Sequence, residues 1–284
     1  MKGSISERII QAEEQWLEPV QAHVAKLFGS TFIPSHDQGH SMRVWEICKN
    51  LLLKMDGPDL LTDQGLAEGL LLASWFHDTG MVRDPGEKHG AYSKDVFEAF
   101  LGENGLNKPH SYHEILKVIE THDTKECSLY SHILPGKNPE MMGILSIADD
   151  LDALGFVGIY RYSEIYLKRG IPSSLLGLKI LTNVRKRFNN ILNSCAAFPA
   201  LIDSYRKDFH LIERFFNRYN QHLLLSGDAE KVLWGELGIV NHIRAYSVEA
   251  EIRPEDFMKQ AEVADSGTIV KTYFKRLHDE LEIT

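Results

Sequence analysis

The sequence predicts an all-helical protein, and three observations favour this fold class. Apolar residues recur at helical spacing along most of the chain, and no segment alternates apolar and polar residues with a period of two between hairpin turns. Glycine or proline marks several of the breaks between the periodic segments. The composition, 43% hydrophobic and 25% charged residues among 284, is typical of a globular protein.

The first helix is predicted over residues 5–28, where Ile9, Trp16 and Val20 lie on one face and Gly29 follows. After a connector, a second helix is expected over 37–55 and a third over 62–76. The second half of the third helix is apolar on all sides, which predicts burial in a core. The remaining helices are expected over 87–103, 109–122, 139–154, 156–169, 173–193, 197–225, 227–241, 253–264 and 266–282.

The composition break at residues 170–173 predicts a core over residues 1–170 and a C-terminal helical extension over 171–284 that packs on it. The formal net charge of −9 argues against binding to duplex nucleic acid, which requires a basic face, but leaves a small anionic substrate open. The chain shows no leader-like segment and no apolar run long enough to span a membrane, so we expect a cytoplasmic protein. The oligomeric state stays open, with a homodimer as one option.

Three cysteines are far apart and show no paired spacing, which predicts free thiols in a reducing compartment. They are Cys48, Cys127 and Cys195.

Histidines gather in the first half of the chain, together with aspartates, and these side chains are the usual ligands of divalent metals. His77 and Asp78 follow the buried third helix and precede Gly80, so a rigid element would hold both. Taken alone, the pair is explained equally well as a helix C-terminus, where histidine complements the dipole and aspartate begins a turn.

Other histidines lie at the edges of apolar helix faces. His40 shares a face with Arg43, an arrangement that suits a metal beside an anion, although a surface His–Arg pair explains it as well. His89 and His122 each lie on the buried side of a helix, where a single histidine is more often a hydrogen-bonded core residue. His36 is either a partner of a ligand or a loop histidine, and we favour the latter.

Three aspartates follow in the segment ADDLD. Helical geometry places Asp149 and Asp150 on opposite flanks of the apolar stripe and does not choose between them, while Asp152 lies one turn from Asp149. A solvated acidic face is expected to account for at least one of the three.

These residues resemble the H…HD…D pattern of the HD-domain metal-dependent phosphohydrolases. The H-x-x-R-V form of residues 40–44, the HDTG form of residues 77–80 and the later aspartate occur in the order typical of that family, over roughly residues 30–155. The resemblance implies a helical bundle whose residues His40, His77, Asp78 and Asp149 bind one divalent ion. It also implies that His89 and His122 bind a second ion, bridged to the first by Asp78.

The resemblance further implies a hydrolase acting on a nucleotide or another small phosphorylated metabolite through a metal-activated hydroxide, with Fe, Mn, Co, Zn or Ni as the metal. The sequence departs from individual branches: residues 122–125 read HDTK, which disfavours the cyclic-dinucleotide phosphodiesterases, and Met81 stands where some binuclear members have lysine. Arg43, Arg83 and Lys88 are therefore the candidate substrate contacts, with Asp78, Arg43 and Lys88 as candidate catalytic residues.

Two other functions stay open at this point. One is a di-iron oxygenase, with which the additional pair His89 and His122 is compatible. The other is a catalytically silent signalling or scaffold module. The basic segment around Lys179, Arg185 and Lys186 is interpreted as a solvated helix surface.

Overall fold

A computed structural model describes residues 4–29, 31–55, 65–86, 88–122, 140–253, 256 and 267–282. These residues form eleven α-helices and no strand, which confirms the all-helical prediction. The helices are α1 (Ile5–Phe28), α2 (Gln38–Lys54), α3 (Leu66–Phe76), α4 (His89–Glu103), α5 (Tyr112–Thr121), α6 (Met141–Asp152), α7 (Gly155–Lys168), α8 (Ser173–Ser194), α9 (Pro199–Leu225), α10 (Gly235–Ile243) and α12 (Gly267–Glu282). Helix 253–264 of the sequence prediction lies almost wholly outside the described residues.

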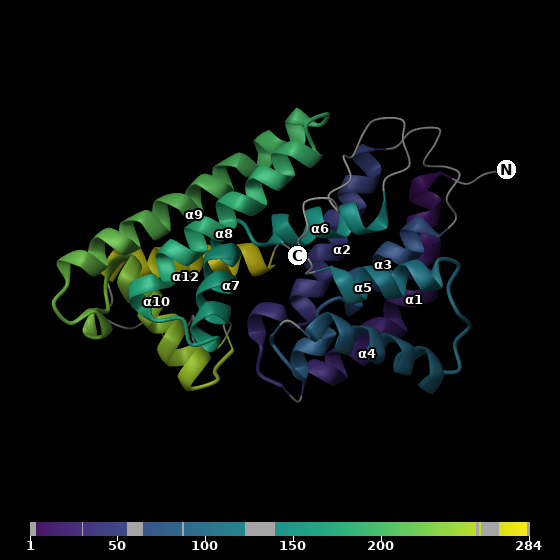
Figure 1. Ribbon diagram of the computed structural model, residues 1–284, viewed down its shortest axis with the longest axis horizontal. Coiled ribbons are helices and arrows are strands. Elements are labelled where there is room, and N and C mark those ends of the chain that lie inside the picture. Colours follow the sequence, from purple (N-terminus) through teal and green to yellow (C-terminus); the bar gives the residue numbers. More distant parts are fainter. Residues whose placement is uncertain are drawn as a thin grey trace. The chain divides into compact units, whose positions relative to one another are not determined.

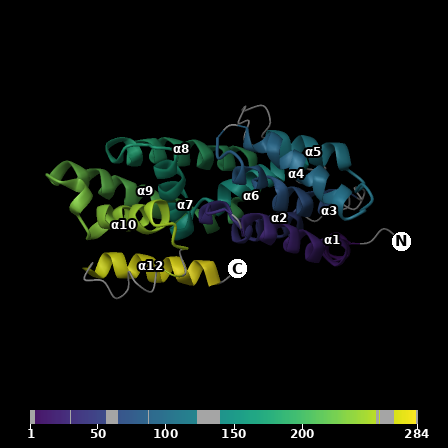
Figure 2. The same ribbon diagram turned by 90° about the horizontal axis from the view of Figure 1, so that it is seen from below.

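The chain divides into two compact units. Unit 1 comprises residues 1–151 and 190–199, and unit 2 comprises residues 152–189 and 200–284. Unit 1 contains α1 to α5 and all of α6 except Asp152, and unit 2 contains α7, α10, α12 and most of α8 and α9. In Figures 1 and 2 the colours run from purple at α1 through teal and green to yellow at α12.

Helix α3 is the centre of unit 1. All eleven of its residues are buried, and it packs against α1, α2, α4 and α5 (Figure 1). Its one carboxylate, Glu68, accepts hydrogen bonds from Trp16 Nε1 at 2.8 Å and from the backbone N–H of His110 at 3.0 Å. A buried charge is tolerated when its oxygens are hydrogen-bonded, so α3 forms a fixed support for the residues at its C-terminal end.

Long helices α8 and α9 of unit 2 pack side by side in antiparallel directions. The rings of Phe188 and Phe209 stack with centroids 4.1 Å apart near one end, and Tyr219 donates a hydrogen bond to the Ser173 carbonyl near the other. At Gly177 a Cβ would lie 2.2 Å from Asn220 Oδ1, so a larger residue here would require the Asn220 side chain to move.

The prediction of one helix over 227–241 is wrong. The structure has a 3-10 turn at Ala229–Lys231, extended backbone at Trp234, and then α10, which continues as a π-helix over Arg244–Glu249. Gly235 has φ of +66°, in the left-handed region, which interrupts any helix running through this point.

Two of the predicted free thiols are confirmed: Cys48 and Cys195 are buried and unpaired, while Cys127 lies outside the described residues. Among the helices that the structure describes, none is both long enough and apolar enough to cross a membrane.

Candidate metal centre

His77 and Asp78 lie at the C-terminal end of the buried helix α3, as the sequence predicts. His77 is the C-cap residue of α3 and is fully buried, and Asp78 begins the 3-10 turn at Thr79–Val82. The Nδ1–H of His77 donates to the carbonyl of Ser74 at 2.9 Å. A carbonyl can only accept, so this bond leaves the Nε2 of a neutral His77 ring as the atom with a free lone pair.

His89 and His122 come from the start of α4 and the end of α5. Each repeats the arrangement of His77, because His89 Nδ1 donates to the Gly86 carbonyl at 2.6 Å and His122 Nδ1 to the Ile119 carbonyl at 2.8 Å. In all three cases the acceptor is the residue three positions earlier. The backbone therefore orients three Nε2 lone pairs, as is typical of histidines that bind metals.

Two glycines allow these helices to converge. A Cβ on Gly80 would lie 2.0 Å from the His89 carbonyl oxygen, and the N–H of Gly80 donates to Ser93 Oγ at 2.8 Å. A Cβ on Gly90 would lie 2.4 Å from the Glu120 carbonyl oxygen. Without these close approaches α4 and α5 could not bring their histidines to the end of α3.

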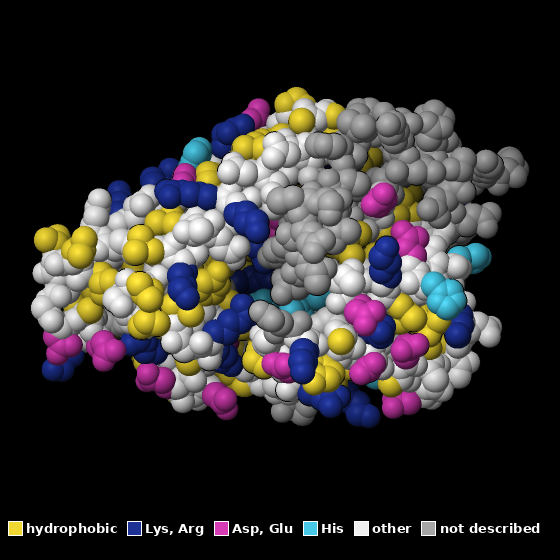
Figure 3. Space-filling view, viewed as in Figure 1, with side chains coloured by type: hydrophobic (Ala, Val, Ile, Leu, Met, Phe, Trp, Pro, Cys, Tyr) yellow, Lys and Arg dark blue, Asp and Glu magenta, His cyan; other side chains and the backbone are white. Residues whose placement is uncertain are grey.

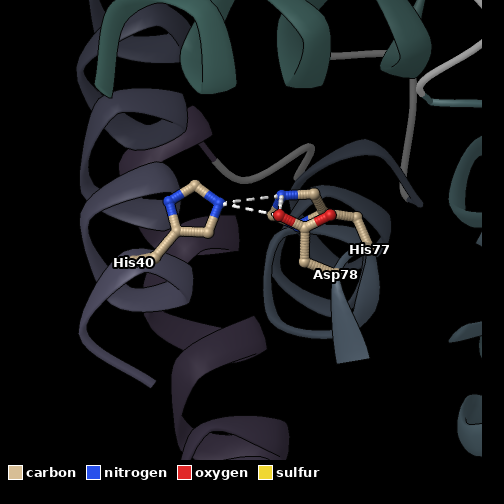
Figure 4. Close-up of side chains that lie close together, drawn as sticks. All are labelled: His40, His77 and Asp78. Carbon is tan, nitrogen blue, oxygen red and sulfur yellow. Dashed lines mark hydrogen bonds and ion pairs between the residues drawn. The ribbon is translucent and has the colours of Figure 1, made fainter. Parts of the chain in front are cut away.

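Asp78 joins two pairs of histidines, one at each carboxylate oxygen. Its Oδ2 lies 3.2 Å from His40 Nε2 and 3.4 Å from His77 Nε2, and Figure 4 shows these three side chains converging from α2 and the end of α3. Its Oδ1 lies 3.1 Å from His122 Nε2 and 3.4 Å from His89 Nε2. Two groups that share Asp78 could thus each hold a metal ion.

The nitrogen atoms in these pairs are close enough to need a shared cation. His89 Nε2 and His122 Nε2 are 3.1 Å apart, and both rings place their proton on Nδ1. Two facing lone pairs repel unless a proton or a metal ion lies between them. His40 Nε2 and His77 Nε2 form a second pair, also 3.1 Å apart.

The separations also fit the ligands of one ion. Donor atoms about 2.1 Å from a tetrahedral or octahedral ion are roughly 3.0–3.4 Å from one another. Within the groups, the separations between donor atoms of different residues run from 3.1 to 3.4 Å. The donor set and its spacing therefore fit a divalent ion at each oxygen of Asp78.

The electrostatics of the cluster favour ionised Asp78 and neutral His77. Burial lowers the pKa of His77 to about 4, although the charge of Asp78 opposes this shift. Burial alone would raise the pKa of Asp78, but the surrounding imidazoles of His77, His122 and His40 hold it well below its ordinary value. An anionic carboxylate beside neutral imidazoles is the protonation state that metal binding requires.

Of the three aspartates near the end of α6, Asp149 faces the cluster, with its Oδ1 3.6 Å from His40 Nε2. The expectation that at least one of the three lies on a solvated face is wrong, because Asp150 is 2% exposed, Asp152 is 6% exposed and the side chain of Asp149 is 18% exposed. Asp152 is buried because its Oδ2 accepts from Arg161 Nη1 at 2.6 Å in unit 2.

The candidate substrate contacts differ in position. Arg43 is buried on α2, one turn after His40. Arg83 is exposed, with its guanidinium 4.0 Å from the centroid of the Tyr92 ring, and Lys88 is exposed immediately before α4. Within the described part of the chain, no hydrogen bond or ion pair joins Arg83 or Lys88 to the cluster.

His36 lies closer to the cluster than the sequence suggested. Its ring centroid is 5.5 Å from that of His40, and its Nδ1 lies 2.7 Å from Ser35 Oγ. The short 3-10 turn at Pro34–His36, which Pro34 begins, brings it there.

Comparisons with protein-family models, with curated proteins and with solved structures found no match. The resemblance to the HD-domain phosphohydrolases therefore depends on the motifs, with which the clustering of these residues is compatible.

Proposed function

We propose that this protein is a divalent-metal-dependent phosphohydrolase of the HD-domain type that cleaves a phosphate ester of a nucleotide or another small phosphorylated metabolite. The observation that carries the proposal is the position of Asp78. One buried carboxylate presents each of its oxygens to a different pair of histidines, and two groups of potential metal ligands result.

His40, His77, Asp78 and Asp149 would hold one ion, and Asp78, His89 and His122 a second. Bound divalent ions would polarise a phosphoryl oxygen and lower the pKa of water, so that hydroxide attack becomes accessible at neutral pH. The carbonyls of Ser74, Gly86 and Ile119 keep the ligand rings in the orientation that this requires.

The basic residues near the ligands supply the substrate contacts of the proposal. The guanidinium of Arg43 can bind a phosphate with two parallel hydrogen bonds, and its burial one turn from His40 limits competition from water. Lys88, exposed and adjacent to His89, would neutralise charge on the substrate, and Arg83 would contact its outer part.

A second candidate is a di-iron oxygenase, because four histidines around a bridging carboxylate also suit iron. Hydrolysis and oxygenation differ in their need for oxygen, so one assay separates them.

The test is release of nitrophenol from p-nitrophenyl phosphate under strictly anaerobic conditions, after reconstitution with Mn, Fe, Co, Ni or Zn. We expect activity with at least one metal and its loss in Asp78→Ala. Asp95→Ala, which removes an exposed carboxylate on α4, is the matched control and should retain activity and metal.

A strict requirement for both oxygen and iron would replace the hydrolase with the oxygenase. A preparation that binds no metal and gains no activity after metal addition would support the silent module instead. If the hydrolase is supported, a screen of phosphorylated metabolites and nucleotides identifies the substrate.

A further inference from the structure

A second candidate site lies in unit 2, in a cavity of about 560 Å³ between the end of α7 and one face of α8. This volume is within the range of small-molecule sites, about 300–1,000 Å³. None of the described residues that line the cavity belongs to the metal cluster. Figure 3 shows Lys and Arg side chains, in dark blue, at the surface over α8 and α9.

The lining has one sign of charge. Arg169, Lys179 and Lys186 line the cavity, and among the residues that the structure describes no aspartate or glutamate does so. The chain as a whole has a formal net charge of −9, so the charge of a concave surface with three cations is opposite in sign to that of the whole chain. A cavity lined by one sign of charge focuses the field and raises the local concentration of oppositely charged ligands.

Arg169 has a structural explanation for its charge, but the two lysines do not. Arg169 caps the C-terminal end of α7, where a cation complements the helix dipole. In the part of the chain that the structure describes, neither Lys179 nor Lys186 forms an ion pair, whereas the nearby Lys168 pairs with Glu164 at 3.2 Å. The two ammonium groups are therefore available to an anion.

The positions on α8 place polar groups between the lysines. Lys179, Thr182, Asn183 and Lys186 share one helix face, because they are spaced by three, four and seven residues. Seven residues correspond to roughly 10 Å along the helix axis, a span that long lysine side chains can cover to meet more than one phosphate group.

A hydroxyl group completes the polar wall. Asn183 Nδ2 donates to Tyr166 Oη at 3.0 Å, so Tyr166 accepts this bond and keeps its own proton for donation to a ligand. Ile171 and Leu178 form an apolar part of the same wall, and Leu178 is 57% exposed. An exposed leucine beside the two lysines suits a ligand that has both charged and apolar parts.

We propose that this cavity binds a small molecule with two or more phosphate groups and an apolar or aromatic part. Lys179, Lys186 and the Tyr166 hydroxyl contact phosphate oxygens, and Leu178 contacts the apolar part. A neighbouring cavity of about 520 Å³ in unit 2 lacks this character, because it is lined by Glu230 and Glu249 as well as Arg244.

The test measures dissociation constants of the full-length protein for two probes that resist cleavage between their phosphorus atoms: methylenediphosphonate and the methylene-bridged analogue of ADP. We expect Lys179→Gln/Lys186→Gln to weaken the binding of both by at least tenfold. Lys271→Gln/Lys275→Gln removes two exposed lysines one turn apart on α12 and is the matched control, with unchanged binding.

Leu178→Ser tests the apolar part and should weaken only the ADP analogue. The Asp78→Ala variant should retain the binding that depends on Lys179 and Lys186, since none of the described residues of the cavity belongs to the metal cluster. Equal binding by the two lysine double variants, or loss of binding in Asp78→Ala, would overturn the proposal. Equal affinity of the wild-type protein for the two probes would overturn its apolar part.

Discussion

Two buried aspartates, Asp78 in unit 1 and Asp152 in unit 2, show how the same side chain can serve two purposes. Asp152 accepts a hydrogen bond at 2.6 Å from Arg161, a permanent cation, and so its charge is balanced within the fold. Asp78 is surrounded by imidazoles at 3.1 to 3.4 Å, and burial keeps at least His77 neutral.

The partner of the side chain, rather than its burial, distinguishes a structural carboxylate from a candidate metal ligand. A buried anion is stable only when a cation or several hydrogen bonds compensate it. Arg161 provides such a cation for Asp152. Around Asp78 the histidines present lone pairs, so a proton or a metal ion must compensate its charge. The two regions should therefore respond differently to substitution.

The largest effect on stability is expected from Asp152→Ala. Removing the carboxylate deprives the buried Arg161 guanidinium of its partner at 2.6 Å, which costs about 3–5 kcal/mol of the free energy of unfolding. Chemical denaturation measures this loss, and the metal content per folded molecule should not change. Asp203→Ala, which breaks an exposed pair with Arg206, should cost less than about 1 kcal/mol. Equal losses in the two variants would show that the pair of Asp152 and Arg161 stabilises the fold no more than an exposed ion pair does.

His122→Ala should change metal content rather than stability. The variant keeps His40, His77, Asp78 and Asp149, so bound metal should fall from two ions towards one per chain. Metal analysis of the reconstituted protein measures the ratio, with His278→Ala, a change at a half-exposed histidine on α12, as the control. Binding of a single ion by the wild-type protein would remove the second site from the proposal.

Much of the cluster was predictable from the sequence because its residues follow motifs at helix ends. His77 and Asp78 follow an apolar run, and His89 and His122 lie at the beginning and the end of helical patterns. The contacts that bring them together were not predictable, because the close approaches at Gly80 and Gly90 join segments distant in sequence. The pairing of Asp152 with Arg161 was missed for a different reason: a pattern of spacing gives the face of a residue and not its partner in another helix.

Gly90→Ala tests whether helix convergence sets the geometry of the centre. The added Cβ would lie 2.4 Å from the Glu120 carbonyl oxygen, so α4 and α5 must separate. We expect a loss of about 1–3 kcal/mol in the free energy of unfolding, as for overpacked cores, and weaker binding of the ion held by His89 and His122. Gly102→Ala is the control, since nothing lies within 4 Å of a Cβ at that position. Unchanged metal affinity in Gly90→Ala would show that the close packing of α4 and α5 does not set the positions of the metal ligands.

The smallest effect is expected at Glu280, a partly buried carboxylate, whose Oε2 accepts from the Val157 N–H at 2.8 Å at the start of α7. Burial and the nearby Asp208 and Asp152 raise its pKa from 4.5 to about 7, although the backbone hydrogen bond from Val157 opposes the shift. Because the folded state holds this proton more tightly than the unfolded chain, its contribution to stability is complete below pH 4.5 and is lost as the pH rises to about 7.

Glu280→Gln keeps an oxygen acceptor and removes the charge, so its stability relative to the wild-type protein should increase between pH 4.5 and 7. Partial exposure limits the gain to on the order of 1 kcal/mol. Thermal unfolding across this pH range measures it, with the exposed Glu282→Gln as the control. A stability difference between Glu280→Gln and wild type that stays constant with pH would mean that the charge of Glu280 is compensated as fully as that of Asp152. A stability difference that rises with pH would place Glu280 between the two aspartates. Asp152 is balanced by an arginine, and Asp78 depends on titratable histidines or a metal ion.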